Sequence, residues 1–234
     1  IEGASVRRTC GQLDRKTYEA VNEALERAGG KWSKKARVHL FDDDPTEILE
    51  TIIHTGQLPA KNPLDFFETP TNIIERMIEL VSIAHEARVL EPSAGNGAIC
   101  DAVRSAIPSA SLYAVEADPK RAARLRTKGH TVYEGDFLEF QPTGRFDAVL
   151  MNPPFTSPTD RLAYVPHIER AYTMLAPGGR LVAIAPGGFS FRSDRRVVLL
   201  RDLVAAHGNA MTLSAGAFDA SGTGVNTVML WMDK

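Results

Sequence analysis

Apolar residues recur along the chain with two spacings, which predict helices in some stretches and strands in others. Within residues 63–234, short apolar runs alternate with stretches of helical spacing, and Gly or Pro separates many of them. Such alternation is typical of buried strands joined by helices. The predicted strands lie at residues 88–90, 111–116, 130–133, 146–150, 180–185, 211–214 and 227–232. The pattern therefore predicts an α/β fold with a doubly wound, mostly parallel, seven-stranded sheet.

Residues 1–62 show a different pattern and are predicted to form a small N-terminal helix–strand–helix module. One helix is predicted from Leu13 to Ala28 and a second from Pro45 to about His54. Between them, residues alternate apolar and polar from Lys35 to Phe41, which predicts one strand. A stretch at residues 60–65, stiffened by proline, is predicted to link this module to the larger domain.

The stretch Met151-Asn152-Pro153-Pro154-Phe155 follows a predicted strand, and its two prolines make it a stiff loop. An exocyclic amine on a base, or a carboxamide nitrogen, is a poor nucleophile because its lone pair is delocalised. Two acceptors, here the Asn152 side-chain oxygen and the Pro153 carbonyl, can hold that lone pair toward a methyl donor. Phe155 can stack on the planar group. The alternative interpretation is an ordinary Asn-Pro-Pro turn.

Three further loops follow predicted strands. The loop Glu91 to Gly97 has glycines two residues apart, where backbone can approach a ligand closely. Glu116 follows about 20 residues later, where a carboxylate can hold ribose hydroxyls. Asp136 can accept a hydrogen bond from an adenine amino group, and Phe137 can cover the ring. Each acid taken singly is explained as well by a solvated loop end.

Thr69 and Pro70 come directly before a stretch of helical spacing. Thr69 is predicted as the N-cap, with Pro70 in the first helical position. A helix N-terminus presents free N–H groups, so it can also hold the carboxylate of a cofactor. This cap and the three loops are all expected at one edge of the sheet, where open α/β sheets bind ligands.

Composition and charge exclude several other classes of protein. The net charge is −2, which excludes a generally basic nucleic-acid coat but not a local basic patch. Cys10 and Cys100 form no disulfide framework, Cys100 is expected in buried packing, and no Cys/His spacing resembles a metal site. No segment has the length of a membrane span, and no signal peptide is visible. Because the chain begins at Ile1, it is expected to be an excerpt or a processed product.

Residues 7–37 contain nine Lys and Arg against four Asp and Glu. Lys31, Trp32, Lys34 and Lys35 lie at the most basic part of this stretch and could hold phosphates and stack a base. The alternative is a solvated charged surface with Trp32 in the core.

From about Phe66 to its end, the chain resembles the catalytic domain of S-adenosylmethionine-dependent methyltransferases, and in particular gamma-class adenine-N6 DNA methyltransferases. The resemblance rests on the order of the motifs: Thr-Pro, a Glu-Pro-x-x-Gly-x-Gly-type loop, an acid, Asp-Phe, then Asn-Pro-Pro-aromatic. It implies a Rossmann-like fold, S-adenosyl-L-methionine as the cofactor, DNA as the partner and a cytoplasmic, bacterial or phage-encoded enzyme.

The resemblance also implies roles for the matched residues. The cofactor would be bound by Thr69, Pro70, Glu91, Pro92, Ser93, Gly95, Asn96, Gly97, Glu116, Ala117, Asp136, Phe137 and Asn152. The target amine would be held by Asn152, Pro153, Pro154 and Phe155, with Phe189 or Phe191 as a second wall. Further substrate contacts are assigned to Lys31, Trp32, Lys34, Lys35, Arg192, Arg195 and Arg196.

The substrate stays open at this point. Sequence-specific members of that family carry a large target-recognition domain, and none fits in this chain. We therefore expect low sequence specificity, an additional specificity subunit, or a missing segment. The same Asn-Pro-Pro-aromatic loop serves RNA methyltransferases acting on adenine-N6 or guanine-N2 and glutamine-N5 methyltransferases of release factors. A catalytically silent binding module is a further alternative. The three arginines of Arg192–Arg196 favour a substrate that bears phosphate.

Overall fold

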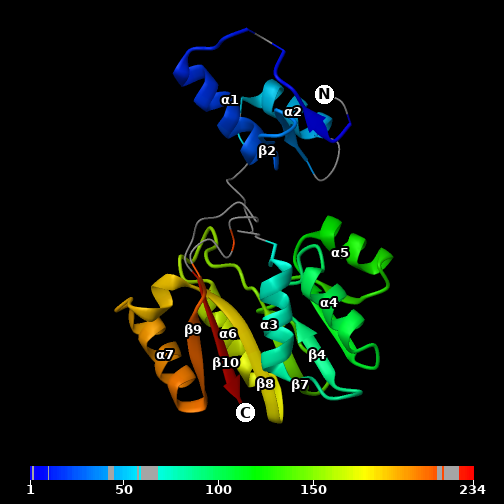
Figure 1. Ribbon diagram of the computed structural model, residues 1–234, viewed down its shortest axis with the longest axis vertical. Helices are drawn as coiled ribbons and strands as arrows, with labels where there is room; N and C mark the ends of the chain where they lie inside the picture. Colours follow the sequence, from blue (N-terminus) through cyan, green and yellow to red (C-terminus); the bar gives the residue numbers. More distant parts are fainter. Residues whose placement is uncertain are drawn as a thin grey trace. The chain divides into compact units, whose positions relative to one another are not determined.

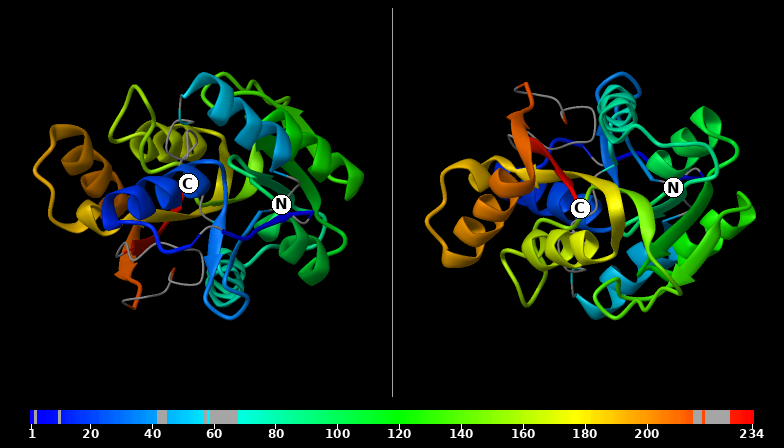
Figure 2. Two further views of the ribbon diagram at one scale, coloured as in Figure 1. Left: turned by 90° about the horizontal axis from the view of Figure 1, so that it is seen from above. Right: turned by 90° about the horizontal axis from the view of Figure 1, so that it is seen from below.

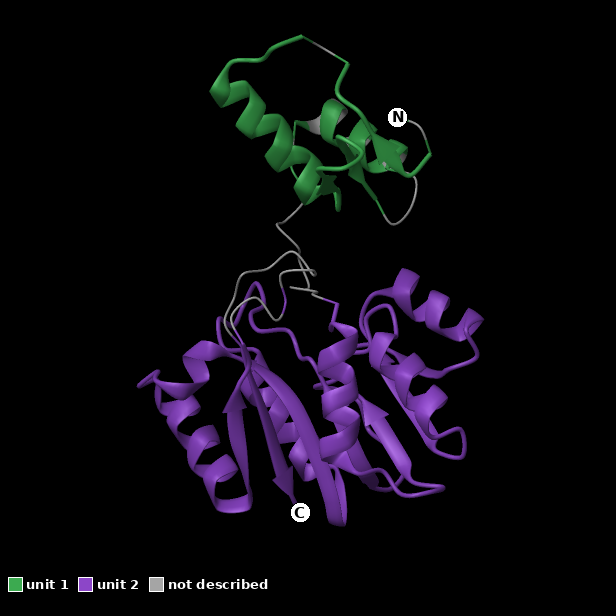
Figure 3. Ribbon diagram, viewed as in Figure 1, with its two compact units in different colours: residues 1–64 green, residues 65–234 purple. Residues whose placement is uncertain are grey.

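The computed structural model describes residues 1, 3–9, 11–41, 45–56, 58, 68–214, 218 and 227–234 (Figure 1). The chain divides into two compact units, Ile1–Leu64 and Asp65–Lys234 (Figure 3). Both the predicted linker and the predicted domain boundary at residue 62 lie outside the described residues. Among the described residues, no helix combines the length and the apolar character needed to cross a membrane.

The larger unit is built on a seven-stranded sheet with the order β6-β5-β4-β7-β8-β10-β9. Neighbours from β6 to β8 are parallel, whereas β10 runs antiparallel to both β8 and β9. This arrangement confirms the predicted α/β fold. The strands are β4 Arg88–Glu91, β5 Ser111–Glu116, β6 Thr131–Glu134, β7 Phe146–Met151, β8 Leu175–Pro186, β9 Gly208–Thr212 and β10 Thr227–Asp233.

Helices cover both faces of this sheet (Figures 1 and 2). Alternate residues of β7 and β8 point to opposite faces, so one apolar cluster contains Val149 and Leu181 and the other contains Leu150 and Val182. The first cluster includes side chains of α6 and α7, and the second includes side chains of α3 and α4. The helical segments are α3 Thr71–Val81, α4 Ala98–Ala106, α5 Pro119–Thr127, α6 Tyr164–Thr173, η1 Gly187–Ser190 and α7 Arg195–His207.

The order of the strands reverses between β4 and β7. The chain passes from β4 outward through β5 to β6, then returns to the other side of β4 with β7 and continues to β8. At such a switch point the following loops diverge to opposite faces and leave a crevice beyond the carboxyl ends of the strands. The Glu91–Gly97 loop and the Asn152–Phe155 loop both begin there.

Some predicted boundaries in the larger unit are wrong. The sequence from Asp160 to Leu175 predicts a helix, but α6 starts only at Tyr164, because Asp160 forms a local turn in which its carboxylate accepts from the Leu162 N–H. That helix ends at Thr173, and Leu175 already pairs with Phe146 as the start of β8. The strand predicted at 211–214 is β9 and begins at Gly208.

The smaller unit contains a three-stranded antiparallel sheet in the order β1-β3-β2, with helices α1 and α2. The two predicted helices are confirmed, but the prediction of a single strand is wrong. Residues 34–37 form a turn, and the predicted strand is shortened to β3, which pairs with β1 and β2. Trp32 is 47% exposed, which also excludes a core position. The elements are β1 Ser5–Val6, α1 Arg15–Arg27, β2 Lys31–Ser33, β3 Val38–Leu40 and α2 Thr46–Thr55.

Candidate active site

A pocket lies beyond the carboxyl ends of β4 and β7 in the larger unit. It brings together five residues that were predicted to bind the cofactor: Thr69, Glu91, Ser93, Asn96 and Asn152. Its described lining also includes Ala94, which lies inside the predicted Glu91–Gly97 loop, and three residues that sequence reasoning did not assign: Glu68, Ala98 and Ile99. The only sequence feature that could have indicated these three residues is that they lie close to Thr69 or Gly97 in the chain.

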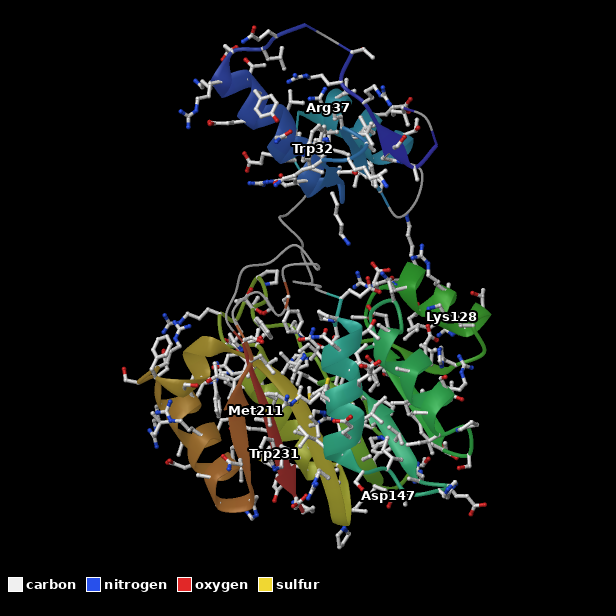
Figure 4. All side chains as sticks on the ribbon, in the orientation of Figure 1. Trp32, Arg37, Lys128, Asp147, Met211 and Trp231 are labelled. Atoms are coloured by element: carbon white, nitrogen blue, oxygen red, sulfur yellow. The ribbon has the colours of Figure 1, made fainter. Side chains whose placement is uncertain are left out.

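The glycine loop is shaped by backbone that L-residues seldom adopt. Gly95 has φ 54° and Gly97 has φ 88°, both in the left-handed region that favours glycine. A Cβ on Gly97 would lie 2.6 Å from the Leu125 side chain. Lys128, labelled in Figure 4, donates a hydrogen bond to the Asn96 carbonyl at 2.8 Å. The loop is thus fixed by its own backbone and by a lysine that follows α5.

Glu116 is tied directly to the glycine loop. The Gly95 N–H donates to one Glu116 carboxylate oxygen at 2.7 Å. The other oxygen accepts from the Asp118 N–H at 2.8 Å and from the Arg121 guanidinium at 3.0 Å. Glu116 is buried, so these donors compensate for the loss of water around its charge. The structure ties Glu116 to the glycine loop, and its predicted contact with ribose stays a prediction. The contact with Arg121 was not predicted.

Thr69 does not cap the helix. Helix α3 begins at Thr71, Pro70 is its N-cap with an extended ψ of 146°, and no side chain makes a cap hydrogen bond there. The prediction placed the cap one residue too early. Instead, the Asn152 amide nitrogen donates to the Thr69 hydroxyl oxygen at 3.1 Å. This contact joins the Thr-Pro and Asn-Pro-Pro-Phe motifs across 83 residues of sequence.

Glu91 is a buried acid in the pocket lining. The Cys100 thiol donates to its carboxylate oxygen at 2.6 Å. Burial raises the pKa of Glu91 to about 8, so the group is mostly neutral at pH 7. Burial also raises the pKa of Cys100 well above its ordinary value, and Glu91 adds to that effect. The prediction that Cys100 is buried is confirmed, whereas its contact with Glu91 was not foreseen.

The remaining predicted cofactor residues lie outside the pocket lining. Asp136 is exposed and accepts from the Leu138 N–H at 2.8 Å. Phe137 is 3% exposed and packs in the core near His167, which leaves little of its ring for an adenine. Pro92 is buried, while Ala117 is exposed. Their roles stay predictions.

The predicted substrate side contains both buried and exposed aromatic rings. Phe155 is half-buried and packs against both apolar clusters. Pro153 is buried and Pro154 is half-buried. Phe189 is buried in the core, whereas Phe191 is 79% exposed. Of the two candidates for a second wall, Phe191 offers far more ring surface.

The arginine cluster carries less unpaired charge than the sequence suggested. Arg196 forms an ion pair with Asp160 at 2.7 Å, and Arg192 pairs with Asp194 at 3.1 Å. Arg195 is exposed and has no ion pair within the described part of the chain. No group of three His, Cys, Asp or Glu suited to a metal ion occurs among the described residues.

A comparison with protein families matches residues 72–197, more than half of the chain, to the methyltransferase small domain. The chain belongs to this family. The matched residues include the glycine loop, Glu116 and Asn152, so the family assignment covers most of the site just described.

Two curated relatives carry different activities. A release factor glutamine methyltransferase from Geobacter sulfurreducens is 32% identical over 136 residues, which cover 53% of this chain and 47% of that protein. The type II restriction enzyme and methyltransferase RM.BcgI from Heyndrickxia coagulans is 30% identical over 155 residues, covering 53% of this chain and 24% of that protein. The matched region thus spans less than half the length of either relative.

Solved structures show the same fold. A protein from Listeria monocytogenes assigned to the class I S-adenosylmethionine-dependent methyltransferases matches with a TM-score of 0.60 at 15% identity, over 81% of this chain and 67% of that chain. The family match and this shared fold together support S-adenosylmethionine as the cofactor. The residues fit that cofactor, because a pocket at the switch point combines a left-handed glycine loop with a carboxylate fixed beside it.

Proposed function

We propose that this methyltransferase methylates the exocyclic N6 of adenine in DNA. The observation that carries the proposal is the position of Asn152, which lines the pocket and donates through its amide nitrogen to Thr69. An amide oriented in this way suits a flat, weakly nucleophilic nitrogen. The similarity to a restriction enzyme and methyltransferase supports DNA as the substrate.

The chain's own residues would do most of the work by alignment. Bound S-adenosylmethionine supplies an electrophilic methyl group on sulfur. The contact with Thr69 uses the Asn152 nitrogen as a donor, so the amide oxygen is the atom that can accept from the target N–H. The Pro153 carbonyl is the second acceptor. Both would stabilise the positive charge that develops on the attacking nitrogen as the sulfur–methyl bond breaks. The methylated nitrogen would then release its extra proton to solvent, so no titratable base is required.

An adenine in duplex DNA must leave the base stack to reach this site. Phe155, half-buried beside Asn152 in sequence, would stack on the extruded base and offset part of that cost. Phe191 is exposed enough to form the opposite wall. Arg195, exposed and without an ion pair among the described residues, is then the arginine of its cluster best suited to a phosphate.

Glutamine-N5 methylation is the second candidate. It is favoured by the 32% identity to a release factor glutamine methyltransferase. A carboxamide nitrogen poses the same electronic problem as an adenine amine, so the Asn152 loop serves either substrate equally well. RNA bases fit the loop for the same reason. An additional specificity subunit stays a prediction for all of these substrates.

One experiment distinguishes these substrates. The protein is incubated with a radiolabelled methyl donor and, separately, single-stranded DNA, duplex DNA, RNA and a release factor, and the labelled unit is identified after digestion. We expect N6-methyladenine from DNA. Labelled glutamine would replace the proposal with the second candidate. No label in any substrate, despite cofactor binding by calorimetry, would support a silent binding module.

A further inference from the structure

The smaller unit presents a basic hairpin that the methyltransferase pocket does not use. Strands β2 and β3 pair through Lys31 with Leu40, Trp32 with His39 and Ser33 with Val38. The turn between them, residues 34–37, carries two lysines and an arginine and no acidic residue. Figure 4 labels Trp32 and Arg37 on this unit.

The turn holds its charges in a defined shape. The Arg37 N–H donates to the Ser33 carbonyl at 2.8 Å, and the Ala36 N–H donates to the Ser33 hydroxyl at 3.2 Å. Arg37 itself has φ 57°, which closes the turn in the left-handed region. These bonds order the backbone from Ser33 to Arg37, so the loss of entropy on binding a ligand is reduced.

The aromatic ring of the hairpin is both supported and accessible. Trp32 is 47% exposed, and its ring centroid lies 5.0 Å from that of the buried His39 across the strands. Burial lowers the pKa of His39, while Glu26 acts in the opposite direction to a smaller extent. The imidazole is therefore neutral at pH 7 and supports the indole without adding charge. The two rings are tilted by 55°, so His39 packs beside the indole and leaves much of its surface exposed, which suits stacking on a base.

The cations around this ring are available. Lys31, Lys34, Lys35 and Arg37 are all exposed. None of them forms an ion pair with another residue in the described part of the chain, whereas Arg15 and Arg27 on α1 pair with Glu19 and Glu23. Four exposed cations that form no ion pair among the described residues, beside one exposed indole, match a phosphate backbone with an unstacked base.

We propose that the β2–β3 hairpin binds unpaired nucleic acid, with Trp32 stacked on a base and Lys31, Lys34, Lys35 and Arg37 placed on the phosphates. This inference relies on the proposed function for its choice of nucleic acid over an acidic protein. It assigns the smaller unit a role that needs no sequence readout, because every base presents a face to stack on.

The test measures binding without turnover. A fluorescein-labelled oligothymidylate of about 12 nucleotides is titrated with the full chain, and anisotropy is recorded at several KCl concentrations. Trp32→Ala is expected to weaken binding by about 5- to 100-fold. Lys34→Ala with Lys35→Ala should weaken binding and reduce the slope of log affinity against log salt by about 1.4.

Two controls make the result specific. Arg15→Ala with Lys16→Ala, the α1 variant, removes the same charge from α1. It should change affinity much less than Lys34→Ala with Lys35→Ala, the turn variant. In a Trp231→Phe background, Trp32 is the only tryptophan, and its fluorescence should be quenched as the oligonucleotide binds. Trp32→Ala removes the packing of Trp32 on His39 and so could destabilise the hairpin. The turn variant is a second, independent test because it leaves that packing in place.

The proposal is overturned if the turn variant and the α1 variant bind alike, or if poly-glutamate quenches Trp32 as strongly as the oligonucleotide. The result is independent of methyl transfer. A chain that binds the oligonucleotide through the hairpin but methylates only protein glutamine would refute the proposed function and leave this inference intact. If both hairpin variants methylate DNA with unchanged rate and affinity, the inference about the hairpin is refuted and the proposed function stands.

Discussion

At the scale of single residues, Asn152 is the side chain on which methyl transfer should depend most. Asn152→Ala removes an acceptor that acts as charge develops on the target nitrogen, so we expect kcat to fall by about 100- to 1,000-fold. Cofactor affinity, measured by calorimetry, should change little because the glycine loop and Glu116 keep their shape. An equal loss of cofactor affinity and turnover would contradict the assigned role.

Thr69 can be tested as the residue that positions Asn152. Thr69→Val keeps the shape of the side chain but removes the hydroxyl that accepts from the Asn152 amide. We expect kcat to fall by up to about 100-fold with little change in the dissociation constant of the cofactor. Thr69→Ser retains the hydroxyl and should restore most of the rate. The opposite pattern, weak cofactor binding with normal kcat, would show the direct cofactor contact that the family resemblance implies.

Glu91 should make stability depend on pH. Its pKa is about 8 in the folded protein and near 4.5 as an ordinary glutamate, so between these values the folded state holds a proton that the unfolded state releases. Unfolding free energy should therefore fall as pH rises through this window, by up to about 1.4 kcal/mol per pH unit from this group, and level off above it.

Urea unfolding of Glu91→Gln at pH 5 to 8 checks this sign. The variant cannot release the proton, so its stability relative to the wild type should grow as pH rises. Cys100→Ser keeps the carboxyl group and a hydrogen-bond donor and should retain the pH slope of the wild type. Parallel profiles for Glu91→Gln and the wild type would show that Glu91 is ionised in the folded protein.

The sequence predicted which residues meet at the site better than it predicted how they touch. Thr69, Glu91 and Asn152 were expected together because each lies near the same edge of a parallel sheet. The contacts of Arg121 with Glu116 and of Cys100 with Glu91 were not foreseen. Spacing along one strand or loop does not specify the rotamer or partner of a long side chain.

At the scale of elements, the glycine loop before α4 allows a matched test of backbone geometry. Gly97→Ala places a Cβ at φ 88° and 2.6 Å from buried Leu125, so we expect a loss of about 1–3 kcal/mol in stability and weaker cofactor binding. Gly178→Ala has a similar φ of 79° but open space around the Cβ. It should lose less stability and keep full cofactor affinity. Equal effects on cofactor binding would mean that the loop is not part of the cofactor site.

Central strands were predictable because burial on both faces makes them nearly continuous apolar runs. Predicted element boundaries were wrong where pairing between strands outweighs the preference of the local sequence. Pro177-Gly178-Gly179 reads as a stop, yet it lies inside β8, whose pairing with β7 shifts register at Phe146 to Ala148. The alternation around Lys34–Arg37 concealed a turn because polar residues suit both an exposed strand and a hairpin loop.

At the scale of the whole molecule, the two units should respond differently to the cofactor. Every described residue that lines the pocket belongs to the larger unit. The two tryptophans report on the units separately, since Trp32 lies in the smaller unit and Trp231 in β10 of the larger one. Ligand that binds only the folded larger unit should raise its unfolding free energy by about 2.7 kcal/mol at 100 times the dissociation constant.

Thermal unfolding followed by fluorescence tests this in two variants. Trp32→Phe leaves Trp231, whose transition should move to higher temperature with S-adenosylmethionine. Trp231→Phe leaves Trp32, whose transition should not move, because the described lining of the pocket includes no residue of the smaller unit. If both transitions shift together by the same amount, the two units unfold as one cooperative block, and the smaller unit is then coupled energetically to the methyltransferase site.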